Sequence, residues 1–229
     1  MPVDAILFDK DGTLFDFGAT WNGWAGRVIA DLARGDTGLA EALAEVLDYD
    51  LDAAVFRPTS MAIAESNGDI AHSMSLVLPG MTGPQVERYL EQHSADAALS
   101  PAVPLPAFLD GLAGRGIALG VMTNDSEYSA TSQLTGAGVL DRFAFVAGYD
   151  SGFGAKPAPE PLLAFCEAVD VLPGRAAMVG DSTHDLIAGR AAGMVTIGVL
   201  TGLAGAGELA PFADYVLPNI GHIEGWIAG

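Results

Sequence analysis

The fold of this chain is decided by the stretch VDAILFDKDGTL, which spans residues 3–14. An apolar run over residues 3–8 predicts a buried strand, and this strand ends directly in Asp9 and Asp11. Side chains two positions apart in an extended backbone project to the same side, so both carboxylates are predicted to lean over one point. Such a pair suits a hard cation and a reacting group, because one carboxylate can attack while the other transfers a proton.

Taken alone, this pattern also fits an acidic turn in which Gly12 adopts a positive φ angle. Three later segments favour chemistry: VMTND at 121–125, AKPAPEP at 155–161 and MVGDSTHD at 178–185. They supply a hydroxyl after an apolar run, a lone lysine in a proline-rich loop, and a second apolar run that ends in carboxylates. In this order the four segments resemble the signature motifs of the haloacid dehalogenase (HAD) superfamily of phosphatases, over residues 3–202 apart from an insert.

The second half of the chain alternates short apolar runs with helical patterns. Strands are predicted at residues 117–122, 145–147, 176–179 and 195–199, and helices near 127–135, 161–169 and 185–192. This alternation predicts an α/β fold with a doubly wound, Rossmann-like parallel sheet. Ligands of such sheets bind beyond the carboxyl ends of the strands, which is where Asp9, Thr123 and Asp181 fall.

Residues 17–101 have a different pattern of apolar and polar residues. Helical spacing recurs at residues 39–47 and 84–97, with no clear strand, and a proline-rich connector follows at 100–106. An insert after the first core strand resembles the helical cap of many HAD phosphatases. We therefore predict an α/β catalytic core formed by residues 1–16 and 102–229, and a helical cap at 17–101 that excludes water from the site.

The resemblance implies a role for each polar residue of the first three motifs. Asp9 would attack phosphorus and form an aspartyl-phosphate, and Asp11 would act as the general acid and base. Thr123 and the amide of Asn124 would hold the phosphoryl oxygens. Lys156 would neutralise their charge and restrain Asp9, in keeping with a reaction that depends on positioning and charge neutralisation.

The resemblance also implies a magnesium site. Asp181 would complete it together with the Asp9 carboxylate and the backbone carbonyl of Asp11, and Asp185 would support it by contacting these ligands or through water; oxygen ligands of this kind suit Mg²⁺. Independently of the family, two carboxylates about 4 Å apart repel by about 4 kcal/mol at an effective dielectric near 20. Crowded carboxylates would therefore need a divalent cation in addition to the charge of Lys156. The alternative is that Asp181 and Asp185 merely cap the following helix.

Four further residues are weaker candidates. Lys10 stands where relatives carry an apolar residue, and strand alternation predicts that its side chain points away from the two carboxylates. Arg57 is a candidate for binding a substrate carboxylate or a second phosphate, although a surface arginine is an equal alternative. Trp21 and Trp24 fall where a cap could contact the leaving group, although aromatic core packing is the commoner explanation.

The charge balance excludes several partners. The chain has 29 acidic and 10 basic residues, a net charge of −19, which speaks against nucleic acid or an anionic membrane as a partner. A phosphate site must then carry its own cations, and Lys10 and Lys156 are the only lysines. With one cysteine, Cys166, and no visible signal peptide, we expect a soluble, cytoplasmic monomer or homodimer whose partner is a small phosphorylated metabolite.

These observations together predict Mg²⁺-dependent hydrolysis of a small phosphomonoester, phosphoglycolate-like or another small metabolite. A dehalogenase is disfavoured because that branch lacks the second aspartate, whereas Asp11 is present. A phosphonate hydrolase would need a cap lysine, and neither lysine lies in the predicted cap. Two alternatives stay open: a sugar-phosphate mutase of the same superfamily, and a phospho-aspartate switch module without turnover.

Overall fold

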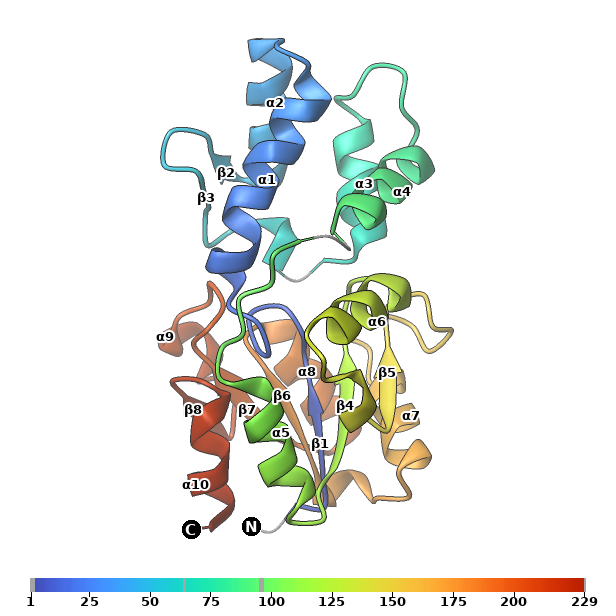
Figure 1. Ribbon diagram of the computed structural model, residues 1–229, viewed down its shortest axis with the longest axis vertical. Coiled ribbons are helices and arrows are strands. Elements are labelled where there is room, and N and C mark those ends of the chain that lie inside the picture. Colours follow the sequence, from blue (N-terminus) through green and yellow to red (C-terminus); the bar gives the residue numbers. More distant parts are fainter. Residues whose placement is uncertain (1–2, 64, 95–96, 229) are drawn as a thin grey trace.

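A computed structural model of the protein describes residues 3–63, 65–94 and 97–228. The molecule has a lower lobe built on a parallel sheet and an upper lobe of helices (Figure 1). The sheet has six strands in the order β5-β4-β1-β6-β7-β8, and every neighbouring pair is parallel. The strands are β1 (Ala5–Phe8), β4 (Ala118–Met122), β5 (Phe145–Ala147), β6 (Ala176–Gly180), β7 (Val195–Val199) and β8 (Tyr215–Leu217).

The strand order reverses direction around β1, which confirms the predicted doubly wound α/β fold. The chain moves outward from β1 to β4 and β5, then returns to the other side of β1 with β6, β7 and β8. The switch point of such a sheet is the place where ligands bind, beyond the carboxyl ends of the strands. In this chain that point lies at the ends of β1, β4 and β6.

Helices cover both faces of the sheet, because residues along each strand alternate between two cores. In β1, Ile6 and Phe8 pack in one apolar cluster, whereas Ala5 and Leu7 pack in another on the opposite face. The first cluster includes side chains of α5 (Leu105–Ala113), α6 (Glu127–Gly136) and α10 (Ile223–Ala228), and the second those of α7 (Glu160–Ala168) and α8 (Thr183–Ala192). A short helix, α9 (Ala206–Leu209), connects β7 to β8.

The upper lobe has its own apolar core, formed by α1 (Phe17–Ala33), α2 (Thr37–Leu47), α3 (Asn67–Ser75) and α4 (Gly83–Ser94). Asp16 caps the start of α1, since its side chain accepts a hydrogen bond from the Ala19 N–H at 2.8 Å. A short hairpin, in which β2 (Tyr49–Asp50) and β3 (Val55–Phe56) each have two residues, joins α2 to the rest of the lobe. The prediction of no strand here was wrong because so short a pair leaves no alternating pattern.

The two connections between the lobes run side by side. Phe15 and Pro101 form an antiparallel bridge, and the Asp16 N–H donates to the Ser100 carbonyl at 2.8 Å. This pairing holds the two chain crossings together at the junction of the lobes. The predicted cap boundary at residues 17 and 101 falls at this pair and stays a prediction.

The upper lobe is closed onto the sheet lobe through polar contacts. Ser94, the last residue of α4, places its hydroxyl 3.2 Å from that of Ser129 on α6, and its carbonyl accepts from Gln133 Nε2 at 2.9 Å. The Tyr149 hydroxyl, after β5, donates to Glu87 of α4. The predicted helix at 84–97 ends at Ser94, and residues 95 and 96 lie outside the described residues. Among the helices of the described part of the chain, none is long and apolar enough to cross a bilayer.

Candidate active site

The loop after β1 brings Asp9 and Asp11 into one pocket. Beyond Phe8 the chain turns, because the N–H groups of Leu14 and Phe15 both donate to the Lys10 carbonyl, at 3.0 and 3.1 Å. Gly12 has a φ of +80° in this turn, a conformation that costs glycine little. Asp9 and Asp11 both line the pocket that lies between the two lobes, as the sequence predicted.

Lys156 pairs with two carboxylates at the bottom of this pocket. Its Nζ lies 2.6 Å from Asp9 Oδ1 and 2.6 Å from Asp185 Oδ1, and its side chain is 3% exposed. Burial lowers the pKa of Lys156, but the charges of Asp185 and Asp9 outweigh burial and raise it. The side-chain amide of Asn124 holds the lysine backbone from both sides, with two hydrogen bonds of 2.9 Å.

Three carboxylates gather at the ends of β1 and β6. One oxygen from each of Asp9, Asp181 and Asp185 lies within 4.8 Å of the others, and all three residues are buried. Asp181 Oδ2 is a buried atom with no hydrogen-bond partner among the described residues. An unsatisfied carboxylate oxygen is costly in a protein interior, and a cation at this point would satisfy it.

The pKa values of these carboxylates also support a cation site. Burial raises the pKa of Asp9 to about 7, with Lys156 opposing the shift and the charge of Asp185 adding to it. Burial, followed by the charges of Asp9 and Asp185, raises the pKa of Asp181 well above its ordinary range. Lys156 alone therefore leaves the cluster with excess negative charge. The donor set, with oxygen ligands only, fits a hard divalent cation such as Mg²⁺.

Two glycines make room for the Asp181 carboxylate. A Cβ atom on Gly202, in the loop after β7, would lie 1.7 Å from Asp181 Oδ2, and one on Gly12 would lie 2.3 Å from it. The Thr13 hydroxyl donates to Asp181 Oδ1 at 3.3 Å. The importance of Gly202 was missed from the sequence, because its loop carries no charged or catalytic side chain.

Asp185 caps the following helix, as one of the two sequence alternatives has it, and its support of a magnesium site stays a prediction. Its Oδ2 accepts from the N–H and the hydroxyl of Ser182, at 3.0 and 2.7 Å, which completes a capping box at the start of α8. Its other oxygen pairs with Lys156. Capping thus orients the carboxylate, and the same orientation presents it to the lysine.

Lys10 does not point away from the carboxylates, so that prediction was wrong. Its Nζ lies 2.6 Å from Asp11 Oδ2 and 3.1 Å from Asp125 Oδ2, and it also donates to Gln133 of α6. The strand ends at Phe8, so strand alternation no longer applies at Lys10, and the flexible side chain folds under the turn. The side chain is fully buried, and the charges of Asp11 and Asp125 raise its pKa although burial opposes them.

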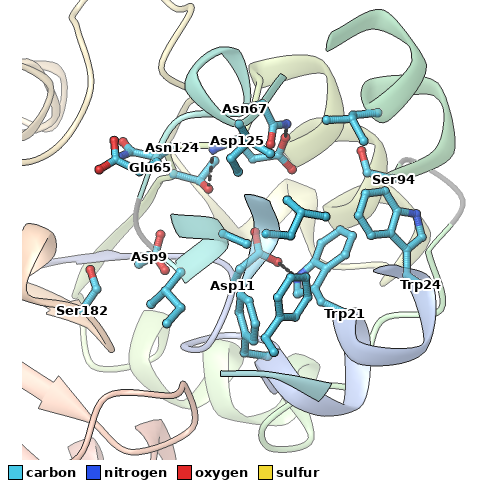
Figure 2. A pocket seen from close by; sticks show the side chains of 18 of the residues that line it. Asp9, Asp11, Trp21, Trp24, Glu65, Asn67, Ser94, Asn124, Asp125 and Ser182 are labelled. Carbon is cyan, nitrogen blue, oxygen red and sulfur yellow. Dashed lines mark hydrogen bonds between the residues drawn. The ribbon is translucent and has the colours of Figure 1, made fainter. Parts of the chain in front are cut away.

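Asp11 is also held from the upper lobe. The indole N–H of Trp21, in α1, donates to Asp11 Oδ1 at 2.8 Å (Figure 2). Trp21 stands edge-on to Trp24, with ring centroids 5.1 Å apart. Both tryptophans line the pocket, so these two side chains reach the site as well as the core of the upper lobe. The side chain of Asp11 is not in the three-carboxylate group, and coordination by its carbonyl stays a prediction.

The other predicted residues differ in their placement. Thr123 and Asn124 line the pocket, and the Thr123 hydroxyl accepts from the Asp125 N–H at 3.1 Å. Arg57 lies on the short hairpin with its side chain 54% exposed, paired with Asp48 and Asp50 at 3.2 and 3.4 Å. It is not among the described residues that line the pocket, so the alternative of a surface arginine fits its position better.

The pocket also includes residues that the sequence did not suggest. Asn67, at the start of α3, donates to Asp125, and Glu65 lies nearby at the side of Asn124 (Figure 2). Asp125 directly follows the Thr123-Asn124 pair, so its place in that motif was a usable signal. Nothing in the sequence around Glu65 or Asn67 distinguishes them from other polar cap residues.

Comparison with known proteins gives the class. The family model described as "Haloacid dehalogenase-like hydrolase" matches residues 6–199. The chain therefore belongs to this family, as the motifs predicted. A phosphoglycolate phosphatase of Rhodospirillum rubrum is 32% identical over 221 residues, which cover 92% of this chain and 87% of the relative. This similarity places the chain among the phosphatases of the family.

Solved structures support the fold. A predicted phosphoglycolate phosphatase from Haemophilus somnus superimposes with a TM-score of 0.75 at 17% identity, over 98% of this chain and 97% of that chain. A candidate beta-phosphoglucomutase from Thermotoga maritima gives a TM-score of 0.68 at 18% identity, over 98% of each chain. At these identities the likeness to both structures supports the fold alone.

Replacement of Lys10 tests its part in holding the site together. Lys10→Met should lower the free energy of unfolding by about 3–5 kcal/mol, because it leaves buried carboxylates without their cation. Chemical denaturation would measure the change. Arg88→Met, on the exposed face of α4, is the matched control and should change stability by less than about 0.5 kcal/mol. Equal stabilities of the two variants would contradict this account of Lys10.

A methyl group on Gly202 tests the space reserved for Asp181. Gly202→Ala should displace the Asp181 carboxylate and weaken binding of a divalent cation by about 10- to 100-fold, as measured by calorimetry. Gly205→Ala lies three residues further along the same loop, where an added Cβ meets no atom within 4 Å. That control should bind the cation as the unmodified protein does. An unchanged affinity in Gly202→Ala would refute the role of Gly202 in making room for the Asp181 carboxylate.

Proposed function

We propose that this protein is a magnesium-dependent phosphomonoesterase that forms an aspartyl-phosphate on Asp9 and uses Asp11 as its general acid and base. One observation carries the proposal: four polar residues from three separate segments line one pocket, namely Asp9, Asp11, Thr123 and Lys156. The carboxylates grouped with Asp9 add the features of a cation site. This combination suits phosphoryl transfer, which depends on positioning and charge neutralisation.

In the first step, the Asp9 carboxylate attacks phosphorus, and the bond from phosphorus to the leaving oxygen breaks. Asp11 gives its proton to that oxygen, so the leaving group departs as an alcohol. Lys156, at 2.6 Å from Asp9, favours the ionised form of the nucleophile against the effect of burial and offsets the charge of the phosphoryl oxygens. The Thr123 hydroxyl accepts from the Asp125 N–H, which directs its own hydrogen toward a phosphoryl oxygen.

In the second step, Asp11 takes a proton from water, and the resulting hydroxide attacks the phosphorus of the aspartyl-phosphate. The bond to Asp9 breaks, which regenerates the carboxylate and releases inorganic phosphate. The Trp21 indole and Lys10 each hold one oxygen of Asp11, so the carboxyl keeps one orientation through both steps. Closure of the helical lobe limits water at the pocket to what the second step needs.

Asp9 and Asp181 would hold Mg²⁺, with Asp185 beside them. When bound, the ion supplies positive charge that offsets the carboxylates and the transferring phosphoryl group. The excess negative charge of the cluster and the orphaned Asp181 Oδ2 support this assignment. Asn124 contributes by positioning the Lys156 loop, and its predicted contact with the phosphoryl group remains part of the proposal.

Two Asp-to-Asn variants separate nucleophile from acid and base. With p-nitrophenyl phosphate and Mg²⁺, Asp9→Asn should reduce turnover at least about 10³-fold and give no burst. Asp11→Asn should lower steady-state turnover by about 10²- to 10⁴-fold, yet release roughly one nitrophenol per site in a burst, because this leaving group needs little protonation. Rapid mixing with detection of nitrophenol and inorganic phosphate would measure both.

The matched control is Asp52→Asn, an exposed position on the hairpin, which should leave both phases unchanged. A normal steady-state rate in Asp11→Asn would rule out its acid–base role. Release of no inorganic phosphate by the unmodified protein, together with isomerised sugar phosphates, would instead indicate a mutase.

The raised carboxyl pKa values predict how stability depends on pH and Mg²⁺. An aspartate with a pKa of 3.8 when unfolded and about 7 when folded binds more protons in the folded state between these values, so metal-free stability falls as pH rises through this window. Mg²⁺ should therefore raise the melting temperature by at least about 3 °C more at pH 7.5 than at pH 5.

Thermal scans in chelator and in Mg²⁺ would measure this difference. The Asp9→Asn variant, which cannot titrate at this position, should lose part of the pH dependence of the Mg²⁺ effect, and the raised pKa of Asp181 should account for the rest. An equal Mg²⁺ effect at both pH values in the unmodified protein would count against the cluster as the cation site.

A further inference from the structure

The part of the pocket beyond Asp11 is apolar. Trp21, which touches Asp11, packs against Trp24, and the lining continues over four elements of the helical lobe with Val28, Phe56, Ile70, Met74 and Leu90. The cavity volume of the whole pocket is about 100 Å³. This volume suits a small apolar leaving group and is well below that of a site for a drug-sized ligand.

The position of this apolar part defines what it would contact. Asp11 protonates the leaving oxygen in the proposed mechanism, so the leaving group must extend from the neighbourhood of Asp11. Figure 2 shows Asp11 and Trp21 between Asp9 on one side and Trp24 on the other. The leaving group of a bound phosphomonoester would therefore lie against Trp21 and Trp24, inside the helical lobe.

This part of the pocket offers no unpaired lysine or arginine to a second acidic group. Lys10, whose Nζ lies 5.5 Å from the centre of the Trp21 ring, is fully buried and already pairs with Asp11 and Asp125. Of the lysines and arginines, all of which lie in the described residues, Lys156 alone lines the pocket, and it already pairs with Asp9 and Asp185. The arginines of the helical lobe are all exposed and do not line it: Arg27, Arg34, Arg57 and Arg88. His184 lines the pocket from the sheet lobe, in the first turn of α8.

The polar groups near the apolar part are acidic or already bonded. Glu65 and Asp125 add negative charge to the lining, and Asp125 accepts from Asn67 and pairs with Lys10. The Ser94 hydroxyl contacts that of Ser129. A carboxylate on the leaving group would thus lose its water, meet no partner cation and face like charges, which is unfavourable on all three counts.

We propose that this enzyme is selective for phosphomonoesters of uncharged, apolar alcohols that fill the aromatic and aliphatic pocket of the helical lobe, and that it discriminates against carboxylate-bearing esters such as phosphoglycolate. The inference rests on the proposed phosphomonoesterase function and specifies its substrate class. It separates this chain from the substrate named for its phosphoglycolate phosphatase relatives, whose leaving group is small and carries a carboxylate.

Three phosphomonoesters, namely phosphoglycolate, isobutyl phosphate and benzyl phosphate, test the inference with the unmodified protein. Isobutyl phosphate has the heavy-atom skeleton of phosphoglycolate with the carboxylate replaced by an isopropyl group, so this pair isolates charge. Benzyl phosphate has a larger, aromatic leaving group, so its comparison with isobutyl phosphate isolates size. We expect kcat/KM to rise at least about 10-fold from phosphoglycolate to isobutyl phosphate, and by about a further 10-fold to benzyl phosphate.

A pair of identical substitutions locates the binding surface. Val28→Phe places a ring in the apolar pocket and should lower the ratio of kcat/KM for benzyl over isobutyl phosphate by at least about 10-fold. Val55→Phe makes the same change at an exposed position of the hairpin, outside the pocket lining, and should leave that ratio as in the unmodified protein. Melting temperatures of both variants establish that they are folded.

The outcomes distinguish the inference from the proposed function. Hydrolysis that depends on Asp9, with phosphoglycolate as good as or better than isobutyl phosphate, keeps the phosphomonoesterase and overturns the selectivity. Equal effects of Val28→Phe and Val55→Phe on the benzyl ratio likewise overturn the assigned surface. Absence of Asp9-dependent hydrolysis for all three esters overturns the function, and the inference with it.

Discussion

The structure of the site depends on the balance of charge among buried carboxylates. Asp9, Asp181 and Asp185 are brought together by parallel strands whose carboxyl ends meet at one edge, and the sheet offers no way to separate them. Lys156 neutralises part of this charge from within the sheet lobe. The loop that carries Lys156 must therefore keep a fixed position beyond the ends of the strands. The side-chain amide of Asn124 fixes it by hydrogen bonds to the backbone N–H and carbonyl of Lys156.

The second buried lysine extends this balance to the helical lobe. Lys10 joins Asp11 to Asp125 and Gln133 of the sheet lobe. Asn67 of the helical lobe reaches the same Asp125, and Trp21 reaches the same Asp11. Closure of the helical lobe and the orientation of Asp11 consequently share one network. Separation of the two lobes would remove two of its hydrogen bonds, so the orientation of Asp11, the proposed acid and base, depends on the contact between the lobes.

The sheet and its polar rim were predictable because they follow from local patterns. Apolar runs ending in Asp9, Thr123 and Asp181 predicted the strands and the edge where they end. In the structure Asp9 lines one pocket with Thr123 and forms one carboxylate group with Asp181. The behaviour of Lys10 was not predictable, since alternation fails where β1 ends. The role of Gly202 depends on a loop whose approach to Asp181 is set by the sheet order, and no local pattern encodes that order.

The lining of the pocket was the least predictable part, and in the proposed function it is also the part that selects the substrate. The residues proposed to hold the phosphoryl group come from short motifs at strand ends, so members of the family can share them while their leaving groups differ. The residues proposed to contact the leaving group come from separate helices of the insert, where an apolar side chain at helical spacing looks the same whether it faces a core or a cavity. Overall similarity to a relative is therefore informative about the class of reaction, whereas the proposed preference for an apolar alcohol has to be argued from what Trp24, Val28 and Met74 surround.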